Sequence, residues 1–188
     1  MKLKRGWLAA AFSVMAAAQL LGGQGQAKGK IIPVTGPLGP RAMVATVSMN
    51  LSTSSVHFAA SNPLGGSVAG NSPLTASFTL TNTTYYRTWT LTIQAQGANL
   101  VGTTGATIAV GAISYTATGS VVSTGGGGTL TINNASGALS TTAVQTASGR
   151  EGTAPFQGQV VYTFAFTDSW NYIPDTYSQT VVLTVTAP

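Results

Sequence analysis

The sequence predicts an all-β protein, an immunoglobulin-like or jelly-roll β-sandwich of about eight or nine strands that follows a cleaved signal peptide. From Val44 onward, apolar and small polar residues alternate with a period of two, which is typical of half-buried strands. Clusters of Gly, Pro and Asn interrupt the alternation at short intervals and supply turns. No stretch after the leader combines a helical period with capping residues, so a helical fold is not expected.

The first element, residues 1–27, has the parts of a secretory signal peptide. A basic start (MKLKR) precedes the uncharged apolar run Leu8–Gly23, which is short for a membrane-spanning helix. Gly25 and Ala27 then place small residues at the two positions that a signal peptidase reads. We therefore expect the mature chain to begin near Lys28, outside the membrane and with no membrane span.

The second element, residues 28–43, is predicted to be a flexible arm rich in Pro and Gly. Pro33, Pro37 and Pro40 exclude a helix or a central strand, because each removes a backbone donor. The apolar run Ile31–Val34 could add to an open sheet edge of a neighbouring copy. A simple spacer and an arm docked on its own domain are the alternatives.

The third element, residues 44–188, is the predicted sandwich domain. Its expected strands are 44–51, 55–60, 75–82, 88–95, 106–116, 129–133, 140–148, 158–167 and 177–185. Its expected turns are 62–66, 69–73, 125–128, 133–137 and 171–175.

The core of the domain is expected at alternate positions of these strands, because successive side chains point to opposite faces. Aromatic enrichment selects the face that carries Tyr162, Phe164 and Phe166. The other expected core residues are Phe78, Leu80, Trp89, Leu91, Ile93, Val160, Val181, Leu183 and Val185.

Charge is scarce in this chain, with 6% charged residues against about 25% in ordinary soluble domains. Of its eight basic residues, three belong to the leader, which leaves five against three acidic residues and a net charge of +2. The five are scattered and form no stripe along a phosphate backbone, so no nucleic-acid partner is expected. The chain has no cysteine, which excludes disulfides and thiolate chemistry.

Acid–base groups are equally sparse. His57 is the only histidine and no GxSxG turn accompanies it, so a serine hydrolase is not expected. Asp168 and Asp175 flank an aromatic segment and could form a glycosidase pair, but turn capping is the simpler role. Gly125–Gly128 is followed by Thr129 and not by Lys, which excludes a phosphate loop and predicts a hairpin tip. We predict a non-enzymatic protein with no cofactor and no metal site.

Aromatic residues are the candidate binding residues, because exposed rings stack on sugar faces and anchor protein interfaces. The alternative is that half or more of them are core or corner residues. The loop at 170–172 is favoured over the strand position, where burial is more common. The candidates are Trp170, Tyr172, Tyr85, Tyr86 and Trp89.

Two segments resemble the WxL family of bacterial cell-surface domains. RTWTLTIQA carries Trp89-Thr90-Leu91, which is similar to that family's first Trp-x-Leu motif, and PDTYSQTVVLTVTAP resembles its closing strand. Val181 stands where the second Trp is expected, and Asp175 replaces the usual Gly. A looser likeness links the closing strand to spore-coat and fibre subunits. Both resemblances imply a non-catalytic β-sandwich of the cell envelope.

These observations predict an exported, non-enzymatic protein on the surface or in the wall of a bacterium. It would act by adhesion to wall glycan or by contact with other surface proteins. The first alternative is a fibre or coat subunit that polymerises through its N-terminal arm. The second is a secreted glycan hydrolase.

Overall fold

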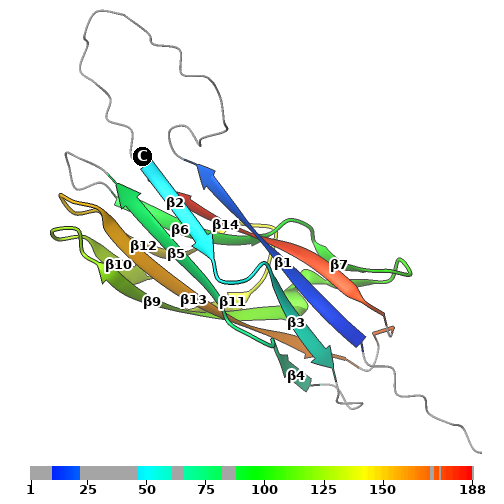
Figure 1. Ribbon diagram of the computed structural model, residues 1–188. Coiled ribbons are helices and arrows are strands. Elements are labelled where there is room, and N and C mark those ends of the chain that lie inside the picture. The colour runs from blue at the N-terminus through cyan, green and yellow to red at the C-terminus, as the bar shows by residue number, and fades with distance from the viewer. Residues whose placement is uncertain are drawn as a thin grey trace, which may run out of the picture.

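The computed structural model describes residues 10–21, 46–60, 66–81, 88–169, 172–173 and 175–187. They form two mainly antiparallel sheets packed against each other, which confirms the predicted β-sandwich (Figure 1). The expected arm, residues 28–43, lies outside the described residues.

The larger sheet, sheet A, has eight strands. Six of them are ordered β10-β12-β6-β14-β1-β3, and β7 pairs with both β14 and β8. Their bounds are β1 Ala10–Leu21, β3 Ser55–Ala60, β6 Thr88–Ala95, β7 Asn99–Gly102, β8 Thr107–Ala109, β10 Thr129–Ile132, β12 Val144–Arg150 and β14 Tyr177–Thr186.

The smaller sheet, sheet B, has six strands, five of them in the order β11-β9-β13-β5-β2, while β4 pairs with the far end of β13. The longest strand, β13, lies at its centre. The bounds are β2 Thr46–Leu51, β4 Gly66–Ala69, β5 Leu74–Thr81, β9 Ile113–Ser123, β11 Ser136–Ala138 and β13 Phe156–Asp168.

The expected core is confirmed, because the alternate residues of the long strands are buried between the two sheets. In β13 the burial follows the expected aromatic face, from Val160 through Tyr162 and Phe164 to Phe166. Across the sheets, the ring of Phe78 lies 4.8 Å from that of Trp89 in an edge-to-face contact. Aromatic contacts of this geometry stabilise a core beyond the area they bury.

A β-bulge places one polar residue inside this core. The register of β12 against β6 shifts between Gln145 and Ala147, so Thr146 and Ala147 are both fully buried. Thr146 Oγ1 lies 3.3 Å from the carbonyl oxygen of Leu91, to which it donates, and 2.6 Å from Tyr162 Oη. With that donor used, the Tyr162 hydroxyl donates to Thr146 and joins the two sheets. Burial raises the pKa of Tyr162 above its ordinary value.

Two predicted boundaries differ from the structure, because the chain changes sheets there. The expected strand 106–116 is broken by the 3₁₀ turn Val110–Ala112, which carries the chain from β8 in sheet A to β9 in sheet B. Gly125–Gly128 is not a hairpin tip, since β9 and β10 belong to different sheets. Positive φ angles at three of these glycines allow the crossing turn.

Some short strands also lie where only turns or no strand were expected. β11 overlaps the end of the expected turn 133–137 and pairs with β9, while β4 and β7 occupy stretches with no predicted strand. This is one reason why the sandwich has more strands than the eight or nine expected.

Residues of the expected leader form β1, a strand within sheet A. It runs parallel to β14 and antiparallel to β3. The structure is that of the chain with its leader present, so it does not test the prediction that residues 1–27 are cleaved.

The buried hydroxyl pair should be energetically coupled. Tyr162→Phe should lower the free energy of unfolding by about 1 kcal/mol, and Thr146→Val by about 1–3 kcal/mol, because it leaves a buried phenol without its acceptor. The double variant should lose less than the sum of the two. Urea denaturation of the three variants measures this, and strictly additive losses would contradict the bond.

Candidate functional site

Trp89, one of the candidate binding aromatics, is a core residue. Its side chain is 1% exposed and lies against the rings of Phe78 and Phe156. The indole Nε1 is buried and has no hydrogen-bond partner among the described residues. The ring therefore has no free face on which a sugar could stack, and it holds β6 against sheet B.

Tyr172 is half-buried and packs on the core. Its ring centre lies 5.9 Å from that of Phe166, and its backbone N–H donates to the Ser169 carbonyl oxygen at 3.0 Å. Nearby, the hydroxyl of buried Tyr177 donates to the Ile173 carbonyl oxygen at 2.7 Å. Tyr172 thus serves as a corner residue with part of its surface accessible.

The remaining three aromatic candidates, Trp170, Tyr85 and Tyr86, lie outside the described residues. Their role in binding stays a prediction.

His57 lies on the exposed face of β3. Its Nε2 is 3.2 Å from Ser55 Oγ, and its backbone N–H donates to the side-chain oxygen of Asn71 at 2.9 Å. Ser55 and His57 are two residues apart on one strand and share a face. The pair sits on an open surface.

Asp175 anchors the turn between β7 and β8, although it lies far from that turn in the sequence. Its Oδ2 accepts hydrogen bonds from the backbone N–H and the hydroxyl of Thr104, at 2.9 and 2.7 Å. Its Oδ1 accepts from the Thr103 hydroxyl and the Thr176 N–H, at 2.5 and 2.7 Å. The hydrogen bonds from Thr103 and Thr104 lower the pKa of Asp175 well below its ordinary value. Asp175 therefore caps a turn, as expected, but this turn, between β7 and β8, is distant from it in the sequence.

Asp168, the other carboxylate of the hypothetical glycosidase pair, occupies a different place. It ends β13 in sheet B, opposite Gly66 of β4, whereas Asp175 precedes β14 in sheet A. A carboxylate held ionised by four donors is also poorly suited to donate a proton near neutral pH.

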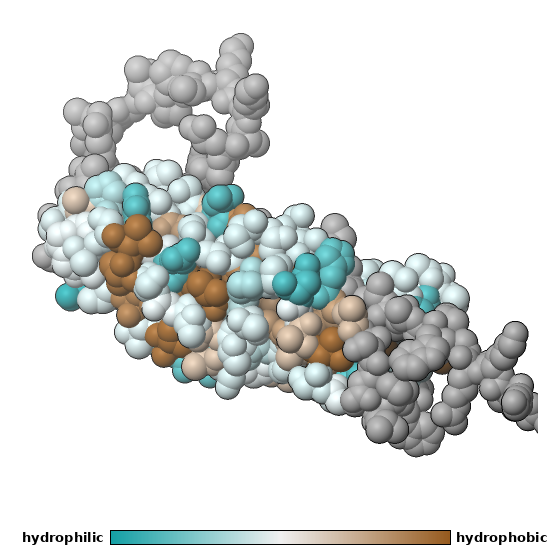
Figure 2. Space-filling model, turned by 60° about the horizontal axis from the view of Figure 1, so that its bottom comes forward, coloured by the Kyte–Doolittle hydropathy of each residue, from teal (hydrophilic) through white to brown (hydrophobic). Residues whose placement is uncertain are grey.

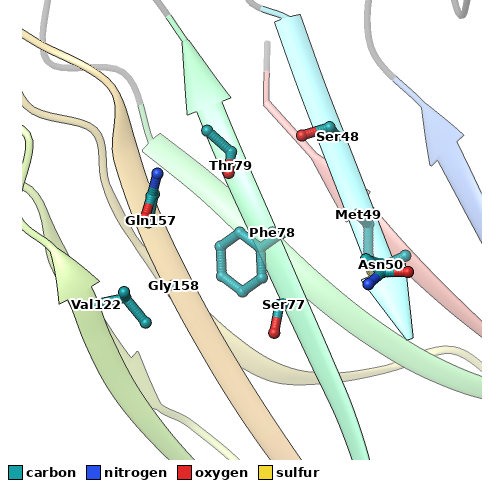
Figure 3. Close-up of a pocket in the computed structure, with 9 residues that line it drawn as sticks. All are labelled: Ser48, Met49, Asn50, Ser77, Phe78, Thr79, Val122, Gln157 and Gly158. Carbon is teal, nitrogen blue, oxygen red and sulfur yellow. The ribbon is translucent and has the colours of Figure 1, made fainter. Parts of the chain in front are cut away.

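A hollow of about 290 Å³ opens beside strands β2, β5, β9 and β13 (Figure 3). Gly158 makes room in it, because a side chain there would collide with the ring of Phe78. The lining is neutral: Ser48, Met49, Asn50, Ser77, Phe78, Thr79, Val122, Gln157 and Gly158. It offers hydroxyl and amide groups for hydrogen bonding and no acid–base group.

The most consequential arrangement is the position of β1 in sheet A (Figure 1). Ten consecutive residues of β1 pair with β14, from Phe12 opposite Tyr177 to Leu21 opposite Thr186. Six residues, Ala10 to Met15, pair on the other side with β3. Among the described residues, β3 pairs with no strand except β1, so one segment joins it to the sheet.

No protein-family model matches the sequence, and a search of curated proteins finds no relative. The resemblance to WxL domains therefore stays a prediction.

In the part of the chain that the structure describes, no three His, Cys, Asp or Glu residues gather where they could hold a metal ion. In the same part, no helix has the length and apolar character needed to cross a membrane.

Variants of Trp89 should separate packing from binding. Trp89→Ala should lower the free energy of unfolding by about 3–5 kcal/mol, because it opens a cavity in the core. Trp89→Phe should lower it by less, since it keeps a ring in place and loses no hydrogen bond. Chemical denaturation measures both. A Trp89→Phe protein that is as stable as wild type but fails to bind a wall fraction would contradict the core role.

Asp175 should contribute stability that depends on pH. Because folding lowers its pKa, this contribution is complete above the ordinary value of 3.8 and is lost as the pH falls below it. Asp175→Asn should therefore lower the denaturation midpoint at pH 7, and the difference from wild type should shrink below about pH 4. Asp168→Asn removes the same charge and is the control. An equal deficit at pH 7 and pH 2.5 would contradict the mechanism.

Proposed function

We propose that the protein is an exported, non-enzymatic structural subunit of a bacterial surface fibre or coat. One observation carries the proposal: the segment that completes sheet A lies within the stretch that the sequence predicts to be removed on export. A mature sandwich without β1 has a place in its sheet for an extended segment. A protein with such a place is suited to being joined to other chains by strand addition.

The surface chemistry supports assembly. Figure 2 shows a face that is mostly intermediate in hydropathy, with small, separate hydrophobic and hydrophilic spots. Only 6% of all residues are charged, so neighbouring copies of the mature chain would repel one another weakly. Thr, Ser and Asn side chains can hydrogen-bond across a contact without a charged group to desolvate.

The positions of the aromatic candidates favour assembly over adhesion through aromatic side chains. Trp89 is in the core and Tyr172 packs on Phe166, so two of the five proposed binding rings have structural contacts. The turn-anchoring role of Asp175 likewise supports a non-enzymatic protein over a glycan hydrolase.

Fractionation of the producing cells tests this function. We expect the exported chain to begin at Lys28 and to sediment with the cell surface in large assemblies that electron microscopy can resolve. The measurements are mass spectrometry of the N-terminus of the exported chain and sedimentation of this chain after its release from the cell surface. An exported monomer in the medium would contradict the proposal, and a monomer that pellets with purified wall would favour adhesion to wall glycan.

A further inference from the structure

The place of β1 in sheet A defines a slot between β14 and β3. One edge of the slot is β14. On the side away from the slot, β14 is already paired with β6 and β7. On the other edge, β3 pairs with no described strand but β1. Two strand spacings separate the slot's edges, which is about 10 Å.

Loss of the leader would expose both ladders and the core between them. The backbone of β14 would lose partners at ten positions and that of β3 at six. The β14 residues that pair with Ala16, Ala18 and Leu20 are core residues, namely Val181, Leu183 and Val185. On β3, the core residues Val56 and Phe58 pair with Val14 and Phe12. Unpaired backbone beside apolar side chains strongly favours the addition of a strand.

We propose that this slot receives residues Lys28–Thr35 of a second copy of the chain, so that copies join end to end. The inference rests on the proposed function and names the contact that builds the assembly. The same cut that empties the slot creates the free N-terminus that fills it, because both follow from cleavage after Ala27.

The arm has the chemistry that the slot requires. Ile32 and Val34 alternate, so both side chains can face the core while the neighbouring residues face outward. Pro33 lacks an N–H, but the ladder with β3 stops at Met15, and beyond that point this edge needs no hydrogen bond.

The arm also has the required length. Sixteen extended residues, 28–43, span roughly 53 Å, whereas the ten paired positions of β14 span roughly 33 Å. The stretch after Thr35, with Pro37 and Pro40, remains as an extended connector to the domain of origin.

Strand direction favours a neighbour's arm over the chain's own. Every described strand pair is antiparallel except that of β1 with β14. The chain's own arm must end at Thr46, where β2 begins, and Figure 1 shows that β2 begins at the end of the sandwich where β1 finishes. It could therefore run antiparallel to β14 only if the residues between Thr35 and Thr46 turned back along the sandwich to reach β2. An arm from a second copy can enter in the antiparallel direction, which gives the more stable pairing along the longer edge.

Charged substitutions in the arm test the contact in the exported protein. The double variant Ile32→Asp/Val34→Asp should reduce the assembled fraction more than about tenfold, because it would bury two carboxylates in an apolar slot. The control is Val122→Asp, which makes the same kind of change at an exposed residue of β9. Assembly lost in the arm variant and kept in the control is the expected result.

Cross-linking identifies the donor chain, since the protein has no cysteine of its own. One preparation carries Thr35→Cys in the arm, and a second carries Thr180→Cys in β14, which an antiparallel arm can place opposite Thr35. After mixing and mild oxidation, we expect a covalent dimer of the two variants. Thr131→Cys, on the exposed face of β10 away from the slot, should give none with the arm variant.

Each other outcome overturns the inference in a recognisable way. A monomeric Thr35→Cys/Thr184→Cys double variant with an internal disulfide would show that the arm fills its own slot. Assemblies that survive Ile32→Asp/Val34→Asp would keep the proposed function and remove the arm from it. Exported wild-type protein that forms no assemblies would overturn both proposals.

Discussion

A strand inside a sheet needs a hydrogen-bonded neighbour on each side, and the whole of sheet A depends on this requirement at β14. Val181, Leu183 and Val185 of that strand are fully buried, so water cannot replace a missing partner there. On one side β6 and β7 supply the partners, and on the other side β1 does. Because β3 pairs through β1 alone among the described strands, the same segment also joins β3 to the rest of the sheet.

The sequence predicts the long strands well because their burial is one-sided. In β13 and β6, most residues on the core face are large and apolar or aromatic, and most of the others are small or polar, so the period of two can be recognised from the sequence alone. The alternation of apolar residues does not predict the change of sheet at Val110–Ala112, because a change of sheet leaves no mark in a local apolar pattern. At β1, an apolar run is compatible both with an export signal and with a strand inside a sheet.

The candidate residues divide in the same way. Trp89 occupies a core position of β6, and the alternation of that strand already indicated its burial. The role of Asp175 as a turn cap could be expected from its local sequence, but its partners Thr103 and Thr104 could not, since they meet it only through tertiary structure. The bulge at Thr146 was equally hidden, because an inserted residue changes which face a side chain takes without changing the sequence pattern.

The length of the ladder along β14 has a mechanical consequence. Force applied across two paired strands breaks their hydrogen bonds one after another, whereas force applied along them loads every bond together. A segment seated against β14 and pulled along its own axis would share the load over every position at which it pairs, and β14 offers ten such positions to β1. Resistance to tension in such a chain of domains would then come from the geometry of loading, with no covalent cross-link between neighbours.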